Sequence, residues 1–232
     1  NERMKIDLAT SINDAMNICP HGFLTFYSSF TFLEDFERYF RRENTSNKRI
    51  IREPRDQRLL KAALKDFERN AGSQNGASLM AVCRGKMSEG IDFSDNKARC
   101  VCVVGIPFPN LSDIKVAMHK SWLDQKKPNA GSQWYVEMAM RAVNQAIGRS
   151  IRHKNDFASV ILFDQRFTGF CNKISKWMAP SIKICNTWDE VADGLKSFFS
   201  EHSTIPDNPT PFLSDESENS QNLTTSQLVS IE

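Results

Sequence analysis

The stretch RCVCVVGI, residues 99–106, is followed by Pro107 and Pro109 and decides the fold. After its arginine it is a short, uninterrupted apolar run, which is typical of a parallel strand buried on both faces. Proline cannot donate to a strand ladder, so the strand has to end there. Cys100 and Cys102 fall on one face of the strand, an awkward geometry for a bridge between them.

Similar apolar runs lie on both sides of this stretch. They are residues 23–29, 78–83, 159–164 and 181–186, and the more polar residues 48–53 are a further short strand. Helical patterns lie between them, at residues 3–18, from a Thr31/Glu34 capping box onward, from Pro54 to Asn70, at 113–127, at 133–152, and from a Thr187/Glu190 box to Phe199. This alternation predicts an α/β fold with an open, mostly parallel sheet and helices on both faces.

Composition agrees with a globular domain followed by a tail. The chain has 232 residues, of which 40% are hydrophobic and 25% charged, and no window approaches the roughly 18 apolar residues of a membrane helix. Residues 203–232 are rich in Ser, Thr, Asn and Pro and hold five acids without Lys or Arg, so we expect them to be disordered. The expected domain is therefore residues 1–202, where 30 basic residues face 23 acidic ones and leave a net charge of +7.

The six cysteines give no support for a metal site. They are scattered without CxxC spacing, so zinc and iron–sulfur ligation within this chain is not expected. Buried reduced thiols in a cytosolic or nuclear protein are the simplest interpretation. The sequence does not begin with Met, which indicates a processed chain or, more simply, a piece of a longer protein.

The segment WYVEMAMRAVNQAIGRSIRH, residues 134–153, carries the clearest chemical signal. As one continuous helix it places a cationic stripe on the face opposite its apolar residues, and this stripe consists of Arg141, Gln145, Arg149 and Arg152. Gly148 inside a helix costs about 1 kcal/mol relative to Ala and leaves room for a ligand. Paired arginines suit a polyphosphate, although solvated surface arginines are the plain alternative.

A complete nucleotide site is nevertheless missing from the sequence. No GxxxxGK[ST] segment is present, because Gly85-Lys86 is followed by Met87, and no acidic DExH run ends a strand. Arginines without a P-loop indicate one half of a composite site. A Rossmann-type dinucleotide enzyme is a weak rival because GxGxxG follows none of the strands.

Several of these motifs resemble one known family. GKMSEGIDFSD (85–95) looks like helicase motif V and NQAIGRSIRH (144–153) like motif VI of XPD-like, iron–sulfur superfamily 2 helicases. VVGIPFPN (103–110), QWY (133–135) and ILFDQRF (161–167) are similar to segments specific to that group. The likeness is strongest to the subgroup with the Fanconi anaemia group J and telomere-elongation helicases. It covers roughly residues 1–200 in order and implies a second RecA-like motor domain.

The resemblance implies roles for individual residues. Catalytic roles at the γ-phosphate fall to the motif VI residues Gln145, Arg149 and Arg152. Motif V supplies the expected ATP contacts, which are Glu89, Gly90 and Asp92. The expected DNA contacts are Tyr27, Ser28, Arg84, Lys86 and Trp134. Phosphate contacts by Arg84 and Lys86 would be blind to base sequence, whereas Trp134 could stack on a base or belong to the core.

The family also implies cofactors and partners. ATP and Mg would bind in a site that an N-terminal P-loop and DEAH domain completes, and the iron–sulfur cluster would lie in that other half. Expected partners are single-stranded DNA, the N-terminal helicase domain and DNA-repair proteins, in the nucleus, with no membrane. The function so predicted is the C-terminal motor half of a 5′–3′ DNA helicase, inactive alone. The alternative is a non-catalytic module that binds DNA or protein.

Overall fold

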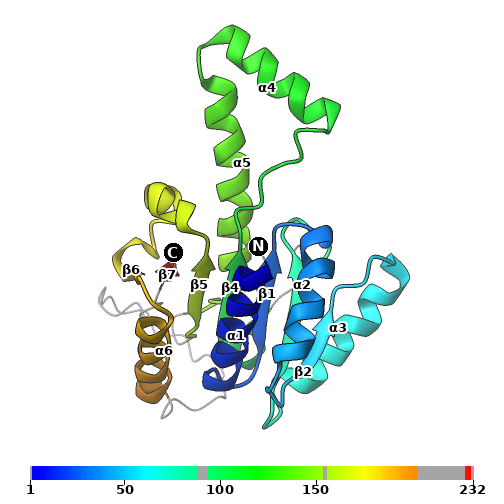
Figure 1. Ribbon diagram of the computed structural model, residues 1–232, viewed down its shortest axis with the longest axis vertical. Coiled ribbons are helices and arrows are strands. Elements are labelled where there is room, and N and C mark those ends of the chain that lie inside the picture. Colours follow the sequence, from blue (N-terminus) through cyan, green and yellow to red (C-terminus); the bar gives the residue numbers. More distant parts are fainter. Residues whose placement is uncertain (1, 88–92, 154–155, 203–227, 231–232) are drawn as a thin grey trace, which may run out of the picture.

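A computed structural model describes residues 2–87, 93–153, 156–202 and 228–230. Its centre is a parallel sheet in the order β2-β3-β1-β4-β5-β7-β6 (Figure 1). The strands are β1 (Phe23–Tyr27), β2 (Arg49–Arg52), β3 (Ala77–Val82), β4 (Cys100–Val104), β5 (Ser159–Phe163), β6 (Ile182–Ile184) and β7 (Leu228–Ser230). The predicted α/β fold with a parallel sheet is confirmed.

Helices cover both faces of the sheet, as expected. The α-helices are α1 (Glu2–Ile18), α2 (Phe30–Glu43), α3 (Gln57–Ala71), α4 (Ile114–Lys126), α5 (Ala130–Ile147) and α6 (Trp188–His202). Short 3-10 helices are η1 (Asp95–Lys97), η2 (Gln165–Lys173) and η3 (Ala179–Ser181). Buried residues of α1, α2 and α6 form a core on one face of the sheet, and those of α3 and α5 form a core on the other.

The strand side chains alternate between these two cores. Phe23 and Tyr27 of β1 belong to the core with α1, α2 and α6, whereas Leu24 and Phe26 belong to the opposite core. No residue of β4 is more than 3% exposed, which is what a strand covered on both faces requires. Cys100 and Cys102 do lie on one face, with their sulfurs 4.0 Å apart, and both are free thiols.

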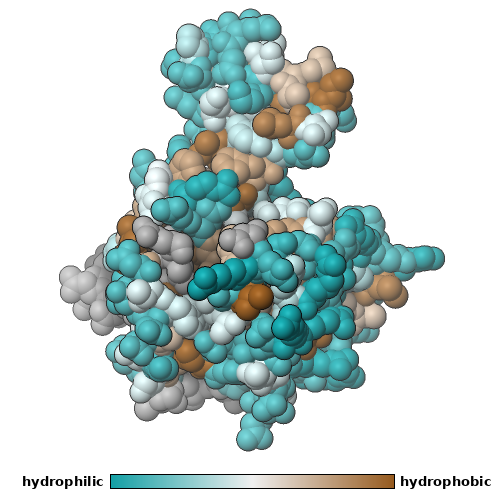
Figure 2. Space-filling model, viewed as in Figure 1, coloured by the Kyte–Doolittle hydropathy of each residue, from teal (hydrophilic) through white to brown (hydrophobic). Residues whose placement is uncertain are grey.

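Helix α5 and the preceding α4 form a projecting arm (Figure 1). The lower half of α5 packs on the sheet, whereas α4 has no buried residue. Leu111, Ile114, Met118 and Trp122 are 49–71% exposed, and Figure 2 shows apolar surface on this arm. Within the described ranges, no helix is long and apolar enough to cross a bilayer.

The observed helix boundaries correct three sequence predictions. Ser29, rather than Thr31, caps α2 by accepting the Phe32 amide at 3.1 Å. Asp56 caps α3, so Pro54 lies before its first turn. Helix α5 ends at Ile147 and Gly148 is its C-cap, so Gly148 is not inside a helix and Arg149 and Arg152 lie beyond the helix end.

The last strand differs from what the tail composition suggested. No ordered element was expected after residue 202, yet Leu228–Ser230 forms β7 and pairs in parallel with both β5 and β6. The rest of the predicted tail, residues 203–227 and 231–232, lies outside the described residues.

Candidate functional site

The predicted site residues lie at two opposite edges of the parallel sheet. Ser28, Arg84 and Lys86 follow the ends of β1 and β3 and so belong to the carboxyl edge. The end of motif VI lies at the amino edge, where Arg99 precedes β4 and Asp156 precedes β5. Met87 and Phe93, which precede and follow residues 88–92 in the sequence, are both fully buried.

At the carboxyl edge a buried carboxylate organises the start of motif V. Glu53 is 2% exposed and accepts the amides of Val82 at 2.8 Å and Met87 at 3.1 Å. These bonds bracket the turn that carries Arg84 and Lys86. A Cβ on Gly85 would lie 2.6 Å from the Glu53 carboxylate oxygens, so glycine is required for this close approach.

Both cationic side chains of that turn are exposed. Arg84 has a left-handed backbone, with φ of 63°, and one of its guanidinium nitrogens donates to the Met138 carbonyl of α5 at 2.7 Å. Partial burial lowers the pKa of Arg84 from its ordinary value, but an arginine keeps its charge at neutral pH. The turn therefore presents two positive charges beside the ends of β1 and β3.

The structure corrects the role expected for Tyr27. Its side chain is fully buried and its ring centroid lies 5.4 Å from that of Phe36, so it offers no surface to DNA. Burial raises the pKa of Tyr27 well above its ordinary value. The neighbouring Ser28 is partly exposed. An aromatic residue at the end of a mostly apolar strand is more simply a core residue, and the sequence already carried that signal.

Trp134 lies on the arm rather than at either edge. It is half-buried, and its ring packs edge-on against that of His119 in α4, with the ring centroids 4.6 Å apart. Its neighbour Tyr135 stacks on Phe108 with the ring centroids 5.0 Å apart, and the Tyr135 hydroxyl donates to the Pro109 carbonyl at 2.7 Å. These contacts join α4, α5 and the segment after β4, which gives the QWY stretch a structural role.

At the amino edge the end of motif VI is connected to two segments. The Asp156 carboxylate accepts the Arg152 amide at 3.2 Å and pairs with Arg99 at 2.9 Å. His153 lies 2.9 Å from Asp95, measured between Nε2 and Oδ1. Arg152 itself is exposed and Arg149 is partly exposed. Asp95, His153 and Asp156 bring three potential metal-ligand atoms within 4.8 Å, but each already bonds to a protein group.

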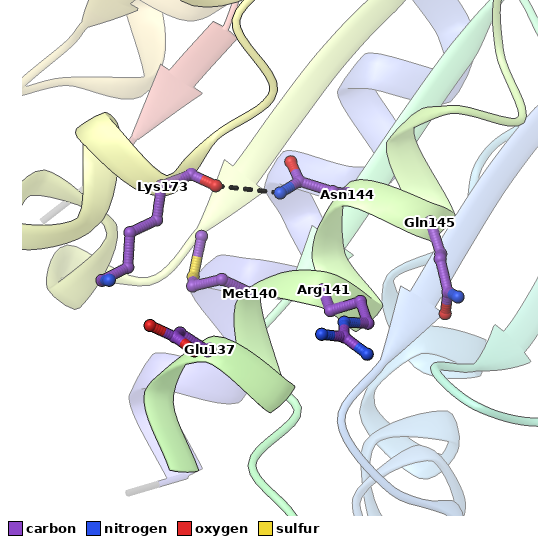
Figure 3. Close-up of a pocket in the computed structure, with 6 residues that line it drawn as sticks. All are labelled: Glu137, Met140, Arg141, Asn144, Gln145 and Lys173. Atoms are coloured by element: carbon purple, nitrogen blue, oxygen red, sulfur yellow. Dashed lines mark hydrogen bonds between the residues drawn. The ribbon is translucent and has the colours of Figure 1, made fainter. Parts of the chain in front are cut away.

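Gln145 lies one helical turn earlier, on the exposed flank of α5. It lines a shallow hollow of about 500 Å³, together with Glu137, Met140, Arg141, Asn144 and Lys173. Figure 3 shows Asn144 bonded to the Lys173 carbonyl, a contact of 2.8 Å, with Gln145 and Lys173 on opposite sides of the helix. Arg149 and Arg152 do not line this hollow, so it is distinct from the edge that carries them.

The motif V residues predicted to contact ATP are Glu89, Gly90 and Asp92, and they lie outside the described residues. The described residues that flank them are informative. Phe93 packs edge-on against Phe67 at 5.7 Å, and Asp95 contacts His153. The two motif sequences therefore meet at the amino edge, although Asp95 and His153 are 58 positions apart.

Comparison with known proteins identifies the family of the chain. A family model described as the helicase C-terminal domain matches residues 12–181. The chain belongs to the helicase C-terminal domain family. Within that family it falls among the XPD-like helicases, as the motifs indicated.

Two curated relatives illustrate the similarity of this helicase C-terminal domain to longer proteins. It is 34% identical over 229 residues to a regulator of telomere elongation helicase 1 homolog from Oryza sativa subsp. japonica, which covers 88% of this chain and 23% of the relative. It is 36% identical over 203 residues to the ATP-dependent DNA helicase chl-1 from Caenorhabditis elegans, a match that covers 84% of this chain and 24% of the relative. The chain thus spans about a quarter of the length of these relatives.

A solved structure confirms the fold of this helicase C-terminal domain. The structure of S. tokodaii Xpd4 superimposes with a TM-score of 0.53 at 19% identity, covering 74% of this chain and 33% of that one. At that identity the likeness concerns the fold alone.

Proposed function

We propose that this helicase C-terminal domain is the second motor domain of an ATP-dependent DNA helicase that moves 5′ to 3′ on single-stranded DNA. One observation carries the proposal: the contact between Asp95 and His153 brings the flank of motif V to the end of motif VI. The proposed nucleotide contacts of motif V and the arginines of motif VI then lie at the same edge of the sheet. DNA-backbone contacts belong to the opposite edge.

In this proposal Arg149 and Arg152 reach across an interdomain cleft to the γ-phosphate, and Gln145 supports them. Guanidinium groups are always charged and stabilise the charge that develops during phosphoryl transfer. Glu89, Gly90 and Asp92 bind the nucleotide from motif V. A P-loop and DEAH domain elsewhere in the polypeptide supplies the remaining ATP and Mg contacts, so the 232-residue chain alone hydrolyses no ATP.

Ser28, Arg84 and Lys86 are the proposed contacts to the DNA backbone, and Trp134 offers a second surface on the arm. The charges at the carboxyl edge support this assignment because phosphate contacts need cations at accessible positions. Closure of the cleft on ATP and reopening after hydrolysis would move this edge along the strand. The relatives are named for telomere elongation and as DNA helicases, and the proposed setting of this domain is the nucleus, with DNA-repair proteins as partners.

The test is DNA-stimulated ATP hydrolysis by the full-length protein. Arg149→Ala and Arg152→Ala should each lower kcat by about 10³-fold or more, as expected for the loss of an arginine finger. Arg69→Ala is the matched control, because Arg69 is an exposed arginine of α3 paired with Asp66, and it should leave kcat unchanged. Robust turnover by the Arg149→Ala/Arg152→Ala double variant would contradict the proposal.

The second candidate is a non-catalytic module that binds DNA or a partner protein. The apolar surface of α4, which includes Ile114 and Met118, favours an interaction role for the arm. A full-length protein that binds single-stranded DNA but hydrolyses no ATP under any condition would select this alternative.

A further inference from the structure

A buried ion pair lies beneath the end of motif VI. Arg99 and Asp156 are 3% and 2% exposed, and their side chains are 2.9 Å apart. The guanidinium of Arg99 also donates to the Asn96 side chain at 3.0 Å and stacks 3.9 Å from the centre of the Phe157 ring. Arg99 directly precedes β4, so the sheet fixes the position of this pair.

The remaining acceptor positions of Asp156 hold the backbone. One carboxylate oxygen accepts the amide of Arg152 at 3.2 Å, and the other accepts the amide of Phe157 at 3.0 Å. Arg152 lies five residues past the last residue of α5, outside regular secondary structure. Helical hydrogen bonds therefore do not fix its backbone, whereas Asp156 bonds to it directly.

The adjacent residue is connected as well. His153 contacts Asp95, the first residue of η1, and the Asp156 amide donates to the His153 carbonyl at 3.0 Å. Two successive residues, 152 and 153, are thus held against the amino edge. A buried charged pair costs several kcal/mol of desolvation, and well-packed apolar residues often replace such a pair without loss of stability. Stability alone is therefore a weak reason for this pair.

We propose that Asp156, held in place by Arg99, is a positioning residue for Arg152. It sets the backbone of motif VI so that the Arg152 guanidinium meets the phosphate, and this role rests on the proposed function. Misplacement of a catalytic group by about 1 Å can cost on the order of 10²-fold in rate. The carboxylate acts through Arg152 and needs no contact with the nucleotide.

Asp156→Asn in the full-length protein tests the role because it keeps the shape and removes one acceptor oxygen. An amide nitrogen would then face either the Arg152 amide or Arg99. We expect kcat for DNA-stimulated ATP hydrolysis to fall about 10- to 100-fold, with the KM for ATP and the affinity for single-stranded DNA nearly unchanged. Asp66→Asn, at a carboxylate that pairs with Arg49 and Arg69 on the surface, is the control and should leave kcat unchanged.

A double-mutant cycle separates positioning from general support of the fold. The Asp156→Asn/Arg152→Ala variant should be no slower than Arg152→Ala alone, because Asp156 acts only through Arg152. The inference would be overturned if the double variant lost kcat by the product of the two single-variant losses. It would also be overturned if Asp156→Asn kept the wild-type kcat while Arg152→Ala was inactive. Wild-type turnover in Arg152→Ala would instead contradict the proposed function.

If Asp156→Asn does not fold, Arg99→Lys gives the second measurement. It keeps the charge but loses the fork that reaches both Asp156 and Asn96. We expect a smaller loss of kcat with folding retained, checked by circular dichroism. A folded Arg99→Lys protein whose kcat matches wild type would overturn the inference.

Discussion

At each edge of the parallel sheet a buried carboxylate accepts backbone amides, but the two carboxylates have different partners. At the carboxyl edge, Glu53 accepts the two amides that bracket the Arg84–Lys86 turn. At the amino edge, Asp156 accepts the amide of Arg152 and also pairs with buried Arg99. Both edges are thus fixed through backbone bonds, and the amino edge adds a buried charge pair. The difference indicates that the amino edge tolerates change less well.

The largest expected effect is at the amino edge. Arg99→Met removes one partner of a buried pair and leaves the Asp156 charge uncompensated, which costs about 3–5 kcal/mol of unfolding free energy. Urea unfolding of the 232-residue chain measures it. The Arg99→Met/Asp156→Leu variant should recover most of that loss, since both charges are then removed. A loss below about 1 kcal/mol in Arg99→Met would mean that the pair is not desolvated.

Glu53→Gln tests the carboxyl edge with a smaller expected effect. The amide side chain has one acceptor oxygen, so one of the Val82 and Met87 amides loses its bond at a cost of about 1–3 kcal/mol. Glu68→Gln is the control, because Glu68 is half-exposed and pairs with Lys97 on the surface. If Glu53→Gln were as costly as Arg99→Met, the contrast between the two edges would fail.

Lys86→Ala separates binding from stability at the carboxyl edge. We expect no stability change beyond about 0.5 kcal/mol, because Lys86 is exposed. The slope of log K against log salt for single-stranded DNA should become shallower by about 0.7. Fluorescence anisotropy at several salt concentrations gives this slope, with Lys196→Ala on α6 as the control. An unchanged slope would remove Lys86 from the DNA contacts.

The smallest expected effect lies away from both edges. A hydrogen bond from Arg55 lowers the pKa of Glu34 from its ordinary 4.5 to about 2, with burial opposing the shift and Arg52 adding to it. A depressed pKa stabilises the fold above pH 4.5, and this contribution is lost as pH falls toward about 2. Glu34→Gln should therefore show a shallower decline of melting temperature over that acid range. An identical decline in both proteins would contradict the shift.

Local sequence predicted the strands well and the helix ends poorly. The apolar runs at residues 23–29 and 99–106 contain β1 and β4 because a doubly buried strand needs uninterrupted apolar residues. Helix α5 ends at Ile147, although the pattern continues to Ile151. Gly148 is the physical reason, since glycine favours a helix end as much as a close ligand approach.

Motifs in the sequence could suggest a candidate site, but its contacts could not be predicted. The order of motif residues identified Arg149 and Arg152, whereas Arg99 and Asp156 gave no signal because they are 57 positions apart and meet only when β4 pairs with β5. Glu53 was missed for the same reason. A lone acid at a strand end is normally a solvated residue, and only the parallel pairing of β2 with β3 brings it under the Arg84 turn.

Strand β1 has both of its neighbours later in the chain. Phe23 pairs with Ser78 of β3 and with Cys100 of β4, so neither edge of β1 can close until most of the first hundred residues have left the ribosome. Contacts this distant in sequence slow folding and leave apolar strands exposed meanwhile. During synthesis, the aromatic segment of β1 and α2 therefore lacks the sheet neighbours of β1 until β3 and β4 are available.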